Sequence, residues 1–111
     1  MNWIDLSSEE QLRQLNNNSA HKPQIIYKHS TRCSISTIVK NRIDRNTQPD
    51  GVDFYFLDII SHRQISNRIA DEYDVRHESP QLLVIRDGKC IYDESHTSIH
   101  MDEIESVLSN Q

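Results

Sequence analysis

The sequence predicts an α/β fold with a central mixed β-sheet flanked by helices on both faces. Apolar runs rich in β-branched and aromatic residues alternate along the chain with segments whose apolar residues recur at helical spacing. Near the C-terminal end, two strand-like runs are separated by Asp87-Gly88, a dipeptide that favours the tight turn of a hairpin. A chain of 111 residues is the size of one compact domain. We therefore expect residues 1–111 to form a single domain.

The first elements are a short strand and a helix. Trp3 and Ile4 suggest the strand. Residues 7–10, Ser-Ser-Glu-Glu, have the Ser-x-x-Glu form of a capping box. They predict the start of a helix that turns Leu12 and Leu15 toward the core.

A second strand and a second helix follow. Residues 24–28 are typical of a strand. Residues 33–44 predict a helix packed on a sheet, and we expect its buried face to consist of Ile35, Ile38, Val39 and Ile43.

The second half of the chain repeats this alternation and ends in a hairpin and a helix. Residues 52–58 predict a central strand, and residues 61–64, Ser-His-Arg-Gln, offer the start of a helix whose apolar face is Ile65, Ile69 and Tyr73. Residues 82–85 and 91–92 predict the two strands of the hairpin. The apolar residues of the last helix are Met101, Ile104, Val107 and Leu108, and acidic residues in its first turn suit the helix dipole.

This order of elements limits the architecture. Strands joined by helical crossovers run parallel, whereas a hairpin adds antiparallel strands, so the sheet must be mixed and covered on both faces. A flavodoxin-like sheet would need more strands than the sequence offers. The prediction is therefore a thioredoxin-like fold.

Composition excludes several classes of function. The net charge is −5, from 17 acidic and 12 basic residues, and the lysines and arginines are dispersed, so we expect no nucleic acid as partner. The first thirty residues lack a basic start followed by an apolar stretch, and the most apolar run, residues 54–60, is interrupted by Asp58. We expect a cytoplasmic protein that does not contact a membrane and whose two cysteines, Cys33 and Cys90, form no disulfide framework.

Cys33 is the candidate catalytic residue, because it stands between a strand and an amphipathic helix. The free N–H groups and the dipole of a helix start favour a thiolate. The supporting residues that we expect around it are Thr31, Arg32, Ser34 and Ser36, of which Arg32 and Ser36 are candidate donors to the sulfur. Residues 33–36 read C-x-x-S, so no neighbouring thiol can resolve a mixed disulfide. The alternative is that Cys33 is simply a small buried apolar residue.

A second candidate feature is the segment His-Glu-Ser-Pro at residues 77–80. Pro80 opens a predicted strand, and a cis Ser79–Pro80 bond would leave the backbone of Ser79 free to pair with an extended client peptide beside the thiol. A trans proline that starts an edge strand is the alternative. We expect Cys90, beyond the hairpin turn, to be structural and distant from Cys33.

We expect no metal site. His29 lies near Cys33 in the sequence, and His96 and His100 are four residues apart, but neither arrangement has the paired ligand spacing of a zinc site.

Residues 28–36, Lys-His-Ser-Thr-Arg-Cys-Ser-Ile-Ser, and residues 75–81, Val-Arg-His-Glu-Ser-Pro-Gln, together resemble the YtxJ-like family of monothiol bacilliredoxins. The resemblance covers nearly the whole chain and includes Asp58, Ser61, Arg63 and the run Asp87-Gly88-Lys89. One departure is Ser34, where the family usually has proline, so this chain keeps an additional N–H donor at the helix start.

The resemblance implies a thioredoxin-like protein that removes bacillithiol, a cysteine-glucosamine-malate thiol, from protein mixed disulfides. It places Cys33 on the active cysteine of the family and Pro80 on the cis-proline. It implies no tightly bound cofactor, with bacillithiol or another low-molecular-weight thiol as co-substrate, S-thiolated proteins as clients, and a small thiol or a redox partner as reductant.

Two other functions remain open at this stage. Monothiol glutaredoxins with C-x-x-S sites share an iron–sulfur cluster between two cysteines and two small thiols, so cluster handling is one alternative. A non-catalytic thioredoxin-fold adaptor that binds partners at the Pro80 edge is the other.

Overall fold

The structure, a computed structural model, describes residues 1–110. Ten elements alternate along the chain: β1 (Trp3–Asp5), α1 (Glu9–Asn18), β2 (Gln24–His29), α2 (Ser34–Asp44), β3 (Asp53–Asp58), α3 (Arg63–Tyr73), β4 (Gln81–Arg86), β5 (Lys89–Ser95), the 3₁₀ turn η1 (His96–Ser98) and α4 (Met101–Ser109). The strand order is β1-β3-β2-β4-β5. β1, β3 and β2 are parallel, whereas β4 and β5 are antiparallel to their neighbours.

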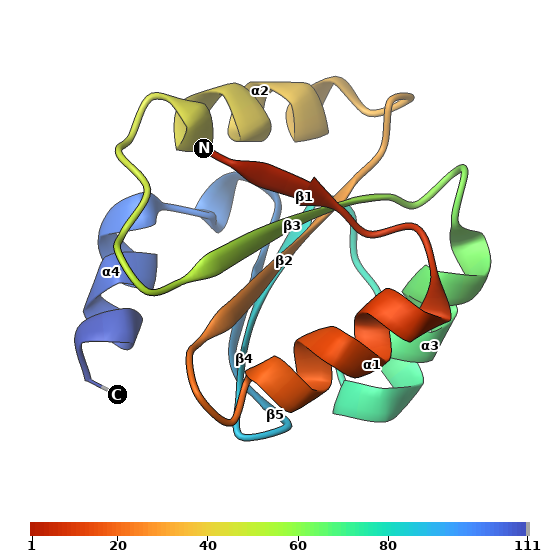
Figure 1. Cartoon of the computed structure of the whole chain (residues 1–111). Coiled ribbons are helices and arrows are strands. Elements are labelled where there is room, and N and C mark those ends of the chain that lie inside the picture. The colour runs from red at the N-terminus through yellow and green to blue at the C-terminus, as the bar shows by residue number, and fades with distance from the viewer. Residues whose placement is uncertain (111) are drawn as a thin grey trace.

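Two helices cover each face of this mixed sheet (Figure 1). On one face, Leu12 and Leu15 of α1 and Ile65 and Ile69 of α3 pack on the sheet. On the other face, the apolar residues come from α2 and α4, and they are Val39, Ile43, Met101 and Ile104. The predicted α/β fold of thioredoxin type is confirmed.

The hairpin forms where the sequence places it. Asp87 and Gly88 have φ angles of 54° and 73°, the left-handed values that a two-residue turn with the twist of a sheet requires. β5 is longer than predicted, at seven residues, and a bulge lies opposite Val84 and Ile85.

The predicted buried face of α2 is wrong in part. Ile35 and Ile38 are 40% and 61% exposed, and the buried stripe is instead Ser36, Val39 and Ile43. Burial of Ser36 is tolerated because its polar atoms find partners inside, as described below. The helix is therefore rotated about its axis relative to the prediction, which has Ile35 and Ile38 facing the sheet.

The starts of two helices lie within their predicted segments. The cap of α1 is Ser8, one residue later than the predicted box: its Oγ accepts the N–H of Gln11 at 3.1 Å, and the Gln11 side chain accepts the N–H of Ser7 at 2.8 Å. Within the predicted start at residues 61–64, the cap of α3 is His62, and the Ser61 hydroxyl donates to Asp58 at 3.1 Å. No helix within residues 1–110 has the length and the apolar character that a membrane crossing needs.

Candidate active site

Cys33 lies immediately before α2, in the short turn that follows the carboxyl end of β2. The turn that brings it there is closed by its own N–H, which donates to the carbonyl of Ser30 at 3.1 Å, and by the N–H of Arg32, which donates to the Ser30 hydroxyl at 3.3 Å. Because β1, β3 and β2 are parallel, their carboxyl ends share this edge of the sheet. The sulfur therefore stands at an edge built from several loops, and Cys33 is partly exposed there.

The cap position of α2 is occupied by the cysteine itself. Cap residues are ordinarily Ser, Thr, Asp or Asn, whose oxygen accepts a backbone N–H of the first turn. No side chain within residues 1–110 makes that bond for α2, and its first turn contains no acidic residue. Cys33 thus occupies the place of a capping residue at the positive end of the dipole of an 11-residue helix, and this position favours a thiolate.

The Ser36 hydroxyl is committed to other partners than the sulfur. Ser36 is fully buried; its Oγ accepts the N–H of Ser30 at 3.2 Å and lies 2.7 Å from Nδ1 of His29. The hydroxyl of Tyr27 donates to the Ser36 carbonyl at 2.7 Å. Ser36 therefore pins the loop that carries Cys33 to the end of β2.

The other expected supporting residues are neighbours of Cys33 in the turn, and their side chains make no bond to it within residues 1–110. Thr31, Arg32 and Ser34 are exposed at the turn, and within residues 1–110 none of their side chains hydrogen-bonds Cys33. Their exposure leaves them available to a ligand at this edge.

The Pro80 turn lies at the same edge. The Ser79–Pro80 peptide bond is cis. Gln81, the next residue, pairs with Lys28 near the carboxyl end of β2, so the register brings the start of β4 beside the loop that follows β2. The carbonyl of Pro80 accepts the N–H of His96 at 2.9 Å.

Cys90 is separated from Cys33 by the sheet. It packs against the core of the α1 and α3 face, whereas α2 lies on the opposite face. Cys90 pairs with Ile85, which in turn pairs with Gln24 at the start of β2. At roughly 3.3 Å per residue, β2 alone separates the two levels by about 16 Å, far beyond the reach of a disulfide. Burial raises the pKa of Cys90 to about 11.

His29 and His96 make contacts with different neighbours. His29 is buried beside the rings of Phe56 and Tyr27, and burial lowers its pKa. Nε2 of His96 lies 3.5 Å from a carboxylate oxygen of Glu78. Within residues 1–110, no three side chains of the ligand types gather closely enough to hold a metal ion.

Asp58 organises the loop next to the Cys33 turn. Its Oδ1 accepts the N–H groups of Ile60 and Ser61 at 3.0 and 3.3 Å. Burial opposes its ionisation, but these donors and the Ser61 hydroxyl outweigh it and hold the pKa of the Asp58 carboxyl below its usual value. Asp58 therefore acts as a loop residue.

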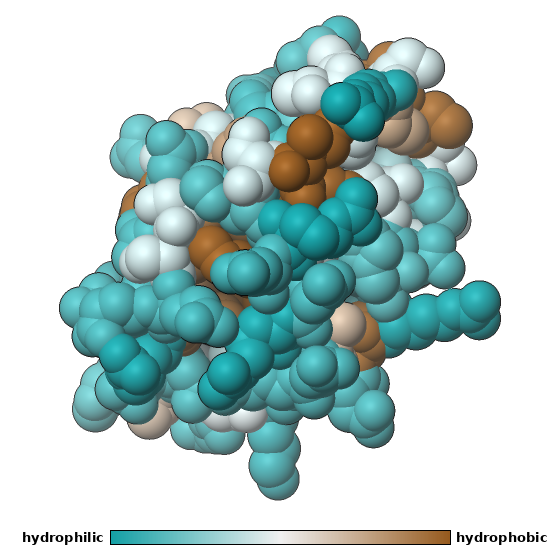
Figure 2. All heavy atoms as spheres, turned by 90° about the vertical axis from the view of Figure 1, so that its right-hand side faces the viewer, coloured by the Kyte–Doolittle hydropathy of each residue, from teal (hydrophilic) through white to brown (hydrophobic). Residues whose placement is uncertain are grey.

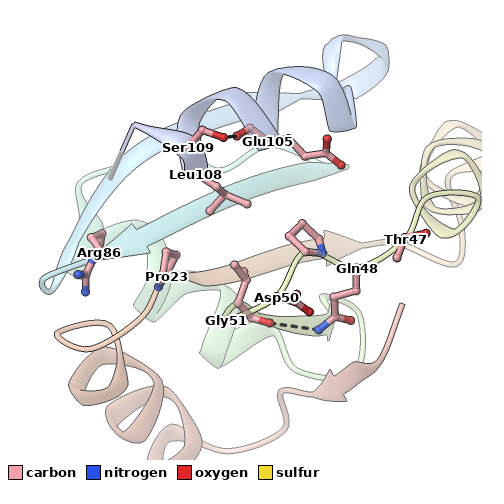
Figure 3. Close-up of a pocket in the computed structure, with 11 residues that line it drawn as sticks. Pro23, Thr47, Gln48, Asp50, Gly51, Arg86, Glu105, Leu108 and Ser109 are labelled. Carbon is pink, nitrogen blue, oxygen red and sulfur yellow. Dashed lines mark hydrogen bonds between the residues drawn. The ribbon is translucent and has the colours of Figure 1, made fainter.

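One cavity lies at the other end of the sheet. It has a volume of about 640 Å³ and is lined by Pro23, Gln48, Arg86 and Glu105 among others (Figure 3). Pro23 and Val52, also in its lining, precede β2 and β3, so the cavity is remote from the carboxyl edge. A smaller cavity of about 340 Å³ opens at the carboxyl edge beside Phe56 and Asp58. Figure 2 shows the side of the molecule on which the loops at the carboxyl edge lie, and its surface is largely hydrophilic with small apolar areas.

Comparison with known proteins agrees with this geometry. The family model described as monothiol bacilliredoxin BrxC matches residues 4–104. A solved structure described as an oxidoreductase with a thioredoxin fold has 28% sequence identity and a TM-score of 0.81, over 94% of this chain and 91% of the other. Thioredoxin from Malassezia sympodialis is 17% identical with a TM-score of 0.72, over 96% of this chain and 87% of that one. Thioredoxin from Nicotiana alata is 20% identical with a TM-score of 0.73, over 97% and 90%.

The match to the family model spans nearly the whole chain, including the Cys33 turn and the Pro80 turn. The chain belongs to the monothiol bacilliredoxin family of thiol redox proteins with a thioredoxin fold.

Proposed function

We propose that this protein is a monothiol disulfide oxidoreductase of the cytoplasm that removes bacillithiol, or a similar low-molecular-weight thiol, from mixed disulfides of client proteins. The observation that carries the proposal is the position of Cys33 at the uncapped start of α2, beside the Ser79–Pro80 turn and with no second cysteine at that edge. Membership of the bacilliredoxin family supports the same chemistry.

The reaction needs one thiolate on the protein and a thiol from solution. The Cys33 thiolate attacks the sulfur of the small thiol in the client's mixed disulfide; a new disulfide forms and the client thiolate leaves with the electron pair. A second small thiol, or a thiol of a redox partner, then attacks the disulfide on Cys33. The attacking thiol and the first small thiol leave as a disulfide with each other, and Cys33 is released as a thiolate.

The surroundings of Cys33 suggest how client and small thiol are held. The N–H and C=O of Ser79 are proposed to pair with an extended segment of the client, as in other cases where a peptide adds to a sheet edge. Thr31, Arg32 and Ser34, exposed at the Cys33 turn, are proposed to contact the small thiol. Among them, Arg32 suits the carboxylates of a malate group.

A mass measurement tests the proposal. The reduced protein, incubated with oxidised bacillithiol, should gain the mass of one small thiol, and peptide mapping should place it on Cys33. Cys33→Ser should gain nothing, whereas the matched control Cys90→Ser should behave as the unchanged chain does. The adduct should then be released by free bacillithiol, and the protein should restore the thiol of a bacillithiolated client.

Other outcomes distinguish the alternatives. Absence of an adduct with bacillithiol and with other small disulfides would reject the redox proposal. A brown iron–sulfur chromophore after anaerobic purification, lost in Cys33→Ser, would favour cluster handling. A Cys33→Ser variant that retained activity in cells would favour an adaptor.

A further inference from the structure

Lys28 is a fully buried lysine without an acidic partner. Its relative exposure is 0%, and no salt bridge within residues 1–110 involves it. By the alternation of β2 it faces the same side of the sheet as Ile26, toward α1 and α3. Burial lowers the pKa of Lys28 to about 8. Because burying a charge lowers the stability of the fold, we expect Lys28 to have a functional role.

The polar partner of Lys28 is His77. The Nζ atom lies 3.3 Å from Nδ1 of His77, and the hydroxyl of Ser66 on α3 lies 3.3 Å from the same nitrogen. An ammonium group can only donate, so Nδ1 must accept. His77 is therefore neutral when Lys28 is charged, with its proton on Nε2.

The charges around the pair keep His77 neutral. Burial lowers the pKa of His77, the cations Lys28 and Arg63 lower it further, and Glu78 acts in the opposite direction. From β5, the thiol of Cys90 is the titratable group that faces Lys28. Two cations 3.3 Å apart in this interior would repel each other strongly, so the pair holds one positive charge.

This contact joins the two segments that form the candidate site. Lys28 lies on the strand that leads to Cys33, five residues before it, and His77 lies in the loop that leads to Pro80, three residues before it. The same loop has two other anchors near the turn, since the carbonyl of Pro80 accepts the N–H of His96 and Nε2 of Gln81 donates to the carbonyl of Arg76 at 2.9 Å. The Oγ of Ser79 and the Oε1 of Gln81 are buried without a hydrogen-bond partner within residues 1–110.

We propose that Lys28 and His77 are a positioning pair that holds the Pro80 turn in place relative to Cys33, and that a second proton on His77 releases the turn. The part of this inference that concerns catalysis rests on the proposed function. Below the pKa of His77 its Nδ1 becomes a donor, the contact with the Lys28 ammonium turns repulsive, and client binding weakens while the thiol itself is unaltered. Loss of the proton from Lys28 at high pH leaves an amine that still donates to Nδ1, so the turn stays in place.

The first arm of the test needs no client. Amide hydrogen exchange of residues 75–81 should accelerate in Lys28→Met and in His77→Leu, about tenfold or more for the loss of a buried hydrogen bond to a charged group. NMR of the imidazole nitrogens should show the Nε2–H form of His77 at pH 7. Unaltered exchange of this loop in both variants, or a charged His77 at pH 7, would overturn the proposal.

The second arm uses de-thiolation of a bacillithiolated client. Lys28→Met and His77→Leu should raise KM about tenfold, while the rate of Cys33 alkylation by iodoacetamide is unchanged. The double variant should be no worse than either single one. His77→Asn, whose Oδ1 replaces Nδ1 as an acceptor that cannot be protonated, should restore KM and abolish its rise at acidic pH. The exposed His21→Asn serves as the matched control and should behave as the unchanged chain.

The two arms separate the two proposals. If the unchanged chain de-thiolates no client, the proposed function fails, and the exchange and NMR results still decide whether the pair holds the turn. If de-thiolation is intact but KM and its pH dependence are unaltered in Lys28→Met and His77→Leu, the positioning role is refuted and the proposed function stands.

Discussion

Replacing the buried Lys28 by methionine should stabilise the protein at neutral pH. The lysine pKa falls from 10.5 to about 8 because burial removes the ammonium from water. A difference of one in pKa corresponds to about 1.36 kcal/mol, so the charged side chain costs about 3 kcal/mol of folding free energy at pH 7. Methionine has a similar length and no charge, and His77 keeps the hydroxyl of Ser66 as a donor.

The buried Lys28 also makes the stability of the protein depend on pH. Because Lys28 has the lower pKa in the folded chain, the unfolded chain binds more protons between about pH 8 and 10.5, and stability rises with pH in that window. The increase from pH 7 to pH 9 should be about 1 kcal/mol. Above pH 9 the raised pKa of Cys90 acts in the opposite direction, and above pH 10 that of Tyr27 does so too.

Urea unfolding at pH 7 and pH 9 measures both effects. The free energy of unfolding of the unchanged chain and of the exposed control Lys89→Met should increase from pH 7 to pH 9. That of Lys28→Met should be higher at pH 7 and should not show this increase. Parallel behaviour of all three proteins, or a less stable Lys28→Met at pH 7, would show that Lys28 is not a buried charge. A variant that is more stable yet binds clients less well would mean that Lys28 is kept for function.

Two further predictions concern the Cys33 edge. Ser36→Ala should lower the free energy of unfolding by about 2 kcal/mol, because it leaves buried polar groups such as Nδ1 of His29 without a partner. The exposed control Ser34→Ala should alter it by less than about 0.5 kcal/mol. Equal effects of the two substitutions in urea unfolding would contradict the burial of the Ser36 hydroxyl. Cys90, with a pKa near 11, should be about a thousandth ionised at pH 8 and so be alkylated much more slowly than Cys33. Time-resolved peptide mapping measures both rates, and comparable rates would place Cys90 at the surface.

The strand and helix order could be predicted from the sequence because it depends on local patterns. Apolar alternation, the Asp87-Gly88 turn and the spacing of Ile65 and Ile69 each act within a few residues. The orientation of α2 could not be predicted in the same way. Ser36 faces inward only because Tyr27, His29 and Ser30 supply its partners, and those contacts exist only once the strand and the helix have packed.

The position of Cys33 at a helix start could likewise be predicted, since a strand, a short loop and a helix follow one another in sequence. The Lys28–His77 contact spans 49 residues and could not. One local feature pointed to it: a lysine in the run Gln-Ile-Ile-Tyr-Lys-His, every residue of which is buried. A charged residue inside a fully buried strand requires a partner that only the tertiary structure identifies.

Departures from the rules of stable folding gather at one edge of this sheet. A cysteine takes the cap of α2 where an oxygen would stabilise the helix, and a lysine is buried one residue before the end of β2. Unpaired buried atoms alone do not mark a site, because Gln24 Oε1 and Arg42 Nε are also unpaired and belong to other parts of the chain. What marks the carboxyl edge is that both departures converge on the two loops that meet there, those of Cys33 and Pro80. Natural sequences keep such local conflicts where function requires them, so we understand the buried charge of Lys28 and the partly exposed thiol of Cys33 as parts of one functional site.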